Sequence, residues 1–385
     1  MTTKKGRPFG NKFVPYWTVP KEPEEDQSYL FPVQTNLDQF PKKPKKYSQN
    51  WHSYDQAQTN EAVVFHEMAY SLLYSLFKEQ PKVIGRPKLE LPERILLMLL
   101  RVYFGKSTRR LIGFLAYSRS KGYLSKQHSY SSICRFFREP EVTAQLMNVL
   151  IETSKPLREY ETSFAVDASG FGTSLYAHYF GADYRKFNRR KGFLKANVMI
   201  GVSTHIITAA VISEKFKHEV RDMPYLVDTT AQTFRLSEVS ADPAYLADYN
   251  LQGIVKHGGK PFILLKSNTD LFPQKHWEKS VVWMETIRSF HYNKAKFMER
   301  YHLRSNIETA FSMIKKKLNP NVKSKDTIAQ RNEVLCNLIC HNLLVLISEI
   351  FENDLSIDWF SERAILSCAI NREIWHKADG CGFVS

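Results

Sequence analysis

Hydrophobic residues recur every three or four positions between about residues 55 and 155, which is the spacing of amphipathic helices. The pattern predicts one helix over Ala62 to Phe77 and a second that has Pro92 in its first turn and runs through Leu100. Two further helices are predicted over Thr108 to Tyr117 and Ser129 to Arg138, because each begins with Ser or Thr, the usual capping residues.

From about residue 160 the pattern changes to short apolar and β-branched runs, which predict strands. The predicted strands are Ser163 to Asp167, Lys195 to Ser203, His205 to Ser213, Phe234 to Ala241 and Pro261 to Lys266. Helices are predicted around Glu219 to Gln232, from Pro243, from Lys294 to Leu318 and from Glu333 to Glu352. Three successive strands favour antiparallel neighbours, and the later alternation favours parallel additions. We expect an α/β fold, a ribonuclease-H-like mixed sheet with flanking helices, preceded by an all-α region.

The composition adds a strong positive charge to this picture. The 385 residues include 54 Lys and Arg but 39 Asp and Glu, a net charge of +15. With 43% hydrophobic and 24% charged residues, the chain is not a fully disordered one. A globular protein this basic usually meets a polyanion, most often nucleic acid.

The charge is most one-sided between Arg101 and Arg138, where no Asp or Glu occurs. The basic residues of this stretch are Arg101, Lys106, Arg109, Arg110, Arg119, Lys121, Lys126, Arg135 and Arg138. An ordinary solvated face mixes both signs, so a phosphate-binding surface is the better explanation. Arg135 and Arg138 share one side of a helix whose other side is apolar. That helix either enters a DNA groove or is an amphipathic helix with exposed arginines.

The stretch from Tyr301 to Lys317 holds the most informative candidate residues. On one continuous helix, Tyr301, Arg304, Glu308 and Lys315 would fall within an arc of about 60°. Wheel geometry alone favours a surface stripe held by pairs such as Arg304 with Glu308.

Two aspartates follow apolar strand segments, Asp167 and Asp242. Each has a structural explanation, since Asp167 could cap a turn and Asp242 before Pro243 is a good helix N-cap. In the expected sheet, however, the first and fourth strands lie side by side, so both carboxylates and Glu308 would meet. Three carboxylates repel unless cations lie among them, and such oxygen ligands suit Mg²⁺ or Mn²⁺.

The spacing of Tyr301, Arg304, Glu308 and Lys315 resembles the Y-(2)-R-(3)-E-(6)-K motif of DDE transposases of prokaryotic insertion sequences. Asp167 and Asp242 look like the first two acidic residues of that family, and the resemblance covers roughly residues 60 to 350. In place of the His-Asp pair often seen after the third strand, this chain has the segment from His218 to Asp222.

The resemblance implies a chemistry and a set of partners. Asp167, Asp242 and Glu308 would hold two Mg²⁺ or Mn²⁺ ions for hydrolysis and transesterification of DNA. The ends of an insertion sequence would be cut and joined to target DNA, without ATP or a covalent protein intermediate. Tyr301, Arg304 and Lys315 would hold the end DNA beside the metals. The partners would be double-stranded terminal inverted repeats and target DNA, with a homodimer plausible in the synaptic complex.

Other residues complete the list of candidates. The loop between the first two strands carries Arg189 and Arg190, which favour contact with the DNA backbone. Cys336, Cys340 and His341 could be taken for metal ligands, but no second ligand pair lies at zinc-site spacing, so buried apolar cysteines are the better explanation. Two alternatives stay open: a transposase-derived DNA-binding protein that no longer cuts, and a metal-dependent nuclease of the same fold.

The chain is expected to divide into four parts. Residues 1–52 read as a basic, Pro-rich flexible arm, 53–158 as a helical DNA-binding domain, 159–352 as the ribonuclease-H-like catalytic domain, and 353–385 as a C-terminal extension. The five cysteines are odd in number and irregularly spaced, which favours a reducing compartment. No signal peptide is evident, and the interrupted apolar stretch from Leu335 to Phe351 predicts a buried helix. We therefore expect a cytoplasmic, nucleoid-associated protein without a membrane partner.

Overall fold

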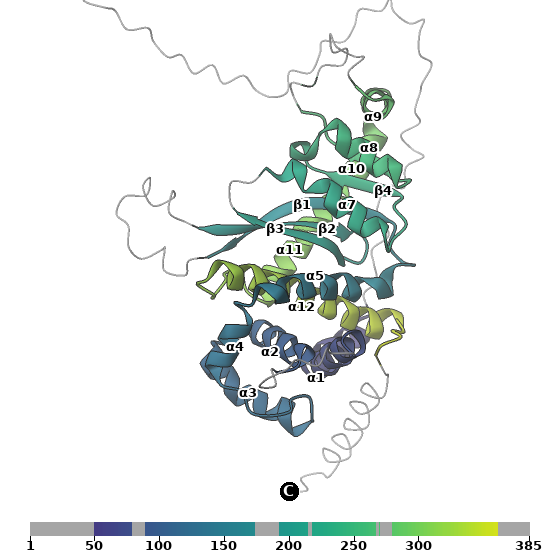
Figure 1. Ribbon diagram of the computed structural model, residues 1–385. Helices are drawn as coiled ribbons and strands as arrows, with labels where there is room; N and C mark the ends of the chain where they lie inside the picture. Colours follow the sequence, from purple (N-terminus) through teal and green to yellow (C-terminus); the bar gives the residue numbers. More distant parts are fainter. Residues whose placement is uncertain are drawn as a thin grey trace, which may run out of the picture. The chain divides into compact units, whose positions relative to one another are not determined.

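Five α-helices precede the first strand in the computed structural model, which describes residues 50–78, 89–173, 192–214, 218–266, 269 and 279–360 (Figure 1). They are α1 (Trp51–Leu76), α2 (Leu91–Tyr103), α3 (Thr108–Ser120), α4 (Tyr130–Phe136) and α5 (Pro140–Ser154). The predicted start signals hold, since Ser107 and Ser129 cap α3 and α4 with their side chains and Pro92 lies in the first turn of α2. The sequence analysis did not predict α5.

The strands form one five-stranded mixed sheet in the order β3-β2-β1-β4-β5. They are β1 (Ser163–Gly172), β2 (Phe193–Gly201), β3 (Ile207–Glu214), β4 (Glu238–Ala241) and β5 (Lys260–Ile263). The first three are antiparallel neighbours, whereas β4 and β5 are added in parallel. This confirms the predicted ribonuclease-H-like sheet with flanking helices after a helical region.

Two strand boundaries differ most from the prediction, the end of β1 and the start of β4. β1 does not end at Asp167 but continues to Gly172, because it remains paired with β2 along this whole segment. β4 begins only at Glu238, although Phe234 and Leu236 before it are buried. The apolar sequence around the end of β1 and the start of β4 predicts a strand, but the hydrogen-bonded partner strand decides where each one begins and ends.

The remaining helices lie between and after the later strands. They are η3 (Glu219–Arg221), α7 (Met223–Ala231), η4 (Pro243–Tyr245), α8 (Asp248–Lys256), α9 (Val281–Tyr292), α10 (Lys294–His302), α11 (Ser305–Lys317) and α12 (Thr327–Asn353). The single helix predicted over Lys294 to Leu318 is wrong, because the chain turns at Leu303 and Arg304. There the backbone hydrogen bonds shorten to three residues, as in Arg304 N to Tyr301 O at 3.0 Å.

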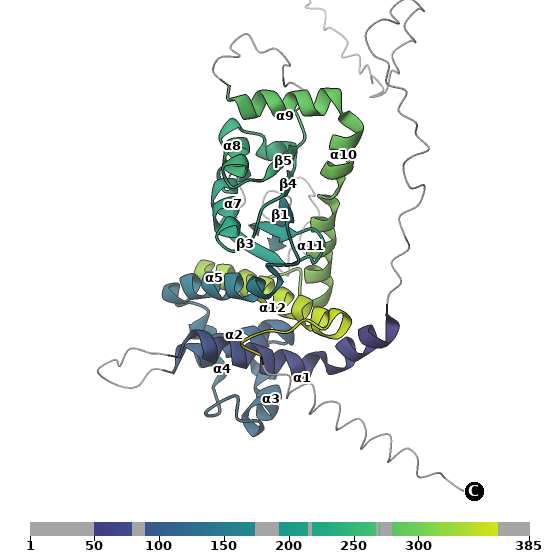
Figure 2. The same ribbon diagram turned by 90° about the vertical axis from the view of Figure 1, so that its right-hand side faces the viewer.

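The two faces of the sheet pack against different helices (Figure 2). Phe164 and Val166 of β1 pack in one core cluster with α7 and α8, whereas Ala165 and Phe171 pack in another with α11 and α12. Side chains alternate along a strand, so Asp167 has the orientation of Ala165 and lies on the α11 side. This alternation gives the carboxylate the same face of the sheet as the helix that carries Glu308.

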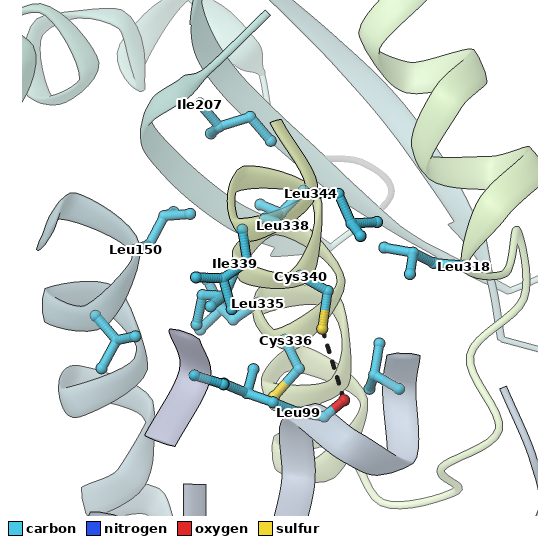
Figure 3. Close-up of a cluster of buried hydrophobic side chains, with 14 of the residues drawn as sticks. Leu99, Leu150, Ile207, Leu318, Leu335, Cys336, Leu338, Ile339, Cys340 and Leu344 are labelled. Atoms are coloured by element: carbon cyan, nitrogen blue, oxygen red, sulfur yellow. Dashed lines mark hydrogen bonds between the residues drawn. The ribbon is translucent and has the colours of Figure 1, made fainter. Parts of the chain in front are cut away.

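Helix α12 is the centre of the larger core cluster, between the sheet and the helices that precede it (Figure 1). Figure 3 shows its Leu335, Ile339 and Cys340 packed among side chains from α2, α5 and β3, with the Cys340 thiol donating to the carbonyl of Leu99 at 3.6 Å. The predicted burial of this segment and of both cysteines is confirmed. Among the described helices, α12 has the length and hydropathy that could cross a membrane, and 83% of its most apolar window is buried inside the structure.

Buried polar side chains of α12 fix its position. The Asn342 side chain pairs with the backbone of Ile207 in β3, accepting its N–H at 2.9 Å and donating to its carbonyl at 2.8 Å, and also donates to Thr153 of α5. Asn332 donates to the carbonyl of Phe137 at 3.0 Å and accepts from Thr143 at 2.7 Å. These directional bonds set the register of α12 against both the sheet and the helical region.

One buried group of α12 makes stability sensitive to acid. Burial lowers the pKa of His341 to about 4, and its ring nitrogen Nε2 lies 3.0 Å from the carbonyl of His205. The folded-state pKa is below the unfolded value, so the contribution of neutral His341 is present above about pH 6.5 and is lost as pH falls toward 4.

We predict that His341→Gln, which can still donate to that carbonyl, reduces the acid loss of stability. Urea unfolding at pH 7 and pH 4.5 should show a decrease in unfolding free energy that is smaller in the variant by about 2 kcal/mol. Equal decreases in the parent and the variant would contradict a neutral, buried His341.

Candidate active site

Asp167 and Asp242 lie next to each other at the centre of the sheet. β1 and β4 are parallel, with Val166 opposite Ala241, so the next residue of each strand is an aspartate. Asp242 caps η4 by accepting the N–H of Ala244 at 2.8 Å, as predicted. Asp167 does not cap a turn, because it lies within β1 and accepts the N–H of Ala168 at 2.8 Å.

Arg304 connects β1 to the helix that carries Glu308. Its guanidinium donates to the Asp167 carboxylate at 2.8 Å through Nη1 and to the Glu308 carboxylate at 3.3 Å through Nη2. The side chains of Arg304 and Asp167 are each 19% exposed, whereas that of Glu308 is 65% exposed. The surface pair of Arg304 with Glu308 therefore exists, but the same arginine also reaches a half-buried carboxylate on the sheet.

The carboxylates give this site an excess of negative charge. Burial raises the pKa of Asp167, and the nearby Asp242 and Glu219 carboxylates raise it further, against the Ala168 N–H and Arg304, which lower it. Burial opposes the charge of Arg304, yet Asp167, Asp242 and Glu308 are among the groups that hold its pKa above the ordinary value. The site thus favours a cation at the place where Arg304 lies.

Lys315 is a half-buried cation on the next turns of α11. Its ammonium donates to the Ser169 hydroxyl at 2.6 Å and lies 5.7 Å from the ring centre of Phe171. Burial lowers its pKa, and within the described residues it forms no ion pair with a carboxylate. A lysine in this environment is suited to an incoming anion such as phosphate.

These side chains border an open cleft of about 460 Å³ along α11 and β1. Asp167, Glu308, Lys315 and Lys316 line it, together with small polar residues. Tyr301 lies at the same end, with the Arg304 guanidinium 5.9 Å from its ring centre. Two carboxylates and two lysines thus line one groove, an arrangement that can hold cations and a phosphate chain together.

A polar network behind Asp242 was not predicted from the sequence. Tyr245 of η4 donates to Asn197 of β2 at 2.9 Å, and Asn197 donates to Asp222 at 2.8 Å. Glu219, in the same short segment, pairs with Lys195 at 2.6 Å. The unusual segment from His218 to Asp222 was the available signal, and its Glu219 carboxylate adds to the negative potential at Asp167.

The donor chemistry of the site fits divalent cations, although no three His, Cys, Asp or Glu side chains of the described residues are arranged to hold a metal ion. Asp167, Asp242 and Glu308 offer carboxylate oxygens, the preferred ligands of Mg²⁺ and Mn²⁺. Arg304 bridges two of them, so its guanidinium supplies positive charge where the carboxylates require it.

Arg135 and Arg138, two of the other predicted DNA contacts, do not line this cleft. Arg135 and Arg138 belong to α4 and its end, where both are exposed while Ile133, Phe136 and Phe137 are buried. The structure confirms an amphipathic helix with exposed arginines. Whether that helix enters a DNA groove stays a prediction. Arg189 and Arg190 lie outside the described residues.

Comparison with known proteins agrees with this geometry. Residues 161–343 match the profile of a family described as "Transposase DDE domain", and this segment contains Asp167, Asp242 and Glu308. No curated protein matches the chain. A similar solved structure is titled "Cryo-EM structure of piggyBac transposase synaptic complex with hairpin DNA (SNHP)", with 11% identity, a TM-score of 0.35, and coverage of 83% of this chain and 81% of that chain. Residues 161–343 are therefore similar to a transposase DDE domain.

We predict that Lys315→Gln separates stability from DNA binding. The unfolding free energy should be unchanged or higher, because the variant removes a desolvated cation without a carboxylate partner in the described residues. Affinity for DNA should fall about tenfold, the size of one charged hydrogen bond. The control is Lys256→Gln, an exposed lysine of α8, which removes the same charge away from the cleft. Equal affinities for the two variants would contradict a phosphate contact at Lys315.

Proposed function

We propose that the chain is a transposase that binds the ends of an insertion sequence, cleaves DNA phosphodiester bonds and joins the 3′ ends to target DNA. The observation that carries this proposal is the cleft of the DDE domain, where Asp167 and Glu308 lie beside Lys315 and Arg304 bridges both carboxylates. A groove lined by groups of both charges can receive a DNA phosphate and the cations that neutralise it.

In this proposal Asp167, Asp242 and Glu308 hold two Mg²⁺ or Mn²⁺ ions. When bound, such ions activate a water or a DNA 3′-hydroxyl and stabilise the leaving oxygen of an in-line displacement. If two divalent ions were bound, their positive charge of about four units would balance the carboxylates, which would then no longer need the Arg304 guanidinium. It can then turn to a DNA phosphate, which its planar fork can bind through two hydrogen bonds.

Other groups position the DNA. Lys315 contributes a point charge to a phosphate, and Tyr301 offers either its ring for stacking or its hydroxyl for a backbone contact. The network of Tyr245, Asn197 and Asp222 supports η4 and so keeps Asp242 beside β1. The partners are double-stranded terminal repeats and target DNA, with two protomers in the synaptic complex.

Two other functions use the same fold. A nuclease would cut but not join, and an inactive DNA-binding descendant would do neither. The presence of all three carboxylates favours an active enzyme over the descendant. A strand-transfer assay with a DNA duplex that carries the terminal repeat of the element distinguishes the three. A transposase gives cleaved and joined products, a nuclease gives only cleaved product, and an inactive descendant gives neither.

Activity should depend on a divalent metal. We predict cleavage and joining with Mg²⁺ or Mn²⁺, no reaction after chelation, and poor replacement by Zn²⁺, because all three proposed ligands are carboxylates. Cleavage rates measured across these ions give the comparison. Full cleavage in excess chelator would rule out the proposed role of the carboxylates.

Glu308→Gln should separate binding from chemistry. The change keeps size and helix propensity but removes one negative charge, so the second metal should bind poorly and joining should fall by orders of magnitude. Binding of the end DNA should persist or tighten, because a carboxylate near phosphates repels them.

The matched control for this experiment is Glu299→Gln, which removes an exposed carboxylate from α10. It should join DNA at the parental rate. If Glu308 served only its pair with Arg304, its substitution would cost about 0.2–0.5 kcal/mol of stability and leave joining intact.

A further inference from the structure

A second cavity, of about 500 Å³, lies between the helical region and the segment that leads into α12. Arg101, Ser107 and Thr108 line it from α2 and the start of α3, Arg138 from the end of α4, and Lys323 and Lys325 from the segment before α12. None of the residues that line this cavity borders the carboxylate cleft. We call it the basic cavity.

The lining of the basic cavity is strongly unbalanced in charge. Four of its side chains are cationic, and no carboxylate is among them. Behind it, Glu333 pairs with Arg101 at 3.0 Å and also accepts the backbone N–H groups of Lys323 and Ser324 at 2.9 Å. This one buried carboxylate is already occupied, so it offsets only part of the positive charge.

The cations in and around the cavity oppose one another. Burial lowers the pKa of Lys323, the positive charges of Arg101 and Lys106 lower it further, and Glu333 raises it. Its ammonium donates to the carbonyl of Gly105, a neutral acceptor. An anion in the cavity would relieve this repulsion.

Two helices also begin at the basic cavity. Ser107 is the N-cap of α3 and Thr108 its first residue, while Ala329 of the first turn of α12 is part of the lining. Helix starts carry partial positive charge and favour anions. Asp326 already caps α12, accepting the N–H groups of Ile328 and Ala329, so the start of α3, and not that of α12, adds to the positive charge of the side chains.

A short segment of the chain leads from the carboxylate cleft to the basic cavity. Lys315 and Lys316 of α11 line the cleft. The segment after α11 then pairs with the end of β1: Gly172 N donates to Pro320 O at 3.2 Å, and Val322 N donates to Gly172 O at 2.8 Å. Lys323 follows directly. Gly172 is five residues beyond Asp167, or about 17 Å along an extended strand. That length equals about five base steps of DNA at 3.4 Å each.

We infer that the basic cavity binds a backbone phosphate of the same DNA duplex whose scissile bond lies in the carboxylate cleft, at least about five base pairs away from that bond. The inference rests on the proposed function, because it assumes that end DNA occupies the cleft. It assigns two cations of the one-sided stretch 101–138, Arg101 and Arg138, to a defined site, which fixes the position of the duplex but reads no base.

The test uses the double variant Arg138→Ala with Lys325→Ala. Both residues are exposed, and neither forms an ion pair within the described residues, so the fold should survive, as thermal unfolding can verify. The control is Arg288→Ala with Lys256→Ala, which removes the same two charges from exposed positions on α9 and α8 that line neither the cavity nor the cleft. Affinity for the end duplex should fall more than tenfold in the cavity variant, and the salt slope should decrease by about two units. An affinity and a slope equal to those of the control would overturn the inference.

A second measurement locates the contact. Single methylphosphonates, which neutralise one phosphate at a time, are placed along the end duplex. One or two adjacent positions should weaken binding by the parent but cause no further loss in the cavity variant. Equal losses in both proteins at every position would overturn the inference.

Inorganic phosphate serves as the competing ligand. If millimolar phosphate raised the melting temperature of the parent only, while no methylphosphonate position distinguished the two proteins, the cavity would bind free phosphate and the DNA inference would be wrong. The proposed function is tested separately, by whether the parent protein joins end DNA to a target. A parent that joins DNA while the cavity variant binds like its control would refute the cavity site alone.

Discussion

The burial of α12 is the constraint on which the rest of the structure depends. This helix packs against α1 and α2 on one side and against the sheet and α11 on the other, with α5 beside it in the same layer. Its buried Asn332 and Asn342 are hydrogen-bonded to the helical region and to β3, so a shift in its register would leave several polar groups unpaired. The helical region and the sheet therefore share one hydrophobic core, and the basic surface of α3 and α4 has a defined position relative to the sheet.

Charge balance is the second constraint, and it acts at the cleft. The parallel pairing of β1 and β4 brings Asp167 and Asp242 together, while the turn between α10 and α11 directs Arg304 to Asp167. Two half-buried carboxylates and Glu308 need positive charge, which Arg304 supplies in this structure. In the proposed reaction, bound metal ions would balance the carboxylate charge instead, and Arg304 would then be available to bind a DNA phosphate. The same electrostatic requirement thus accounts for the resting contact and for the proposed change during catalysis.

The connection from α11 to α12 joins both constraints. It begins after Lys315 at the cleft, pairs with the end of β1, and supplies Lys323 and Lys325 to the basic cavity before it enters the core helix. Because β1 and α12 hold both ends of this segment, the distance between the two cationic sites is set by the core. A rigid spacing between two phosphate contacts positions a duplex without recognition of its bases.

Local patterns in the sequence determined much of this protein. Apolar periodicity and capping residues located α2, α3 and α4, and the order of strands gave the mixed sheet, because these features depend on neighbouring residues. Glu308 was found through motif spacing, and Asp167 and Asp242 through their places at the ends of apolar strand segments. The end of β1, the break between α10 and α11 and the network of Asn197, Asp222 and Tyr245 required the tertiary structure. So did the basic cavity, whose lining residues lie up to 228 positions apart, from Arg101 to Ala329. Periodicity reports which face of an element is buried, whereas strand ends, helix breaks and charge clusters are decided by partners that only folding brings together.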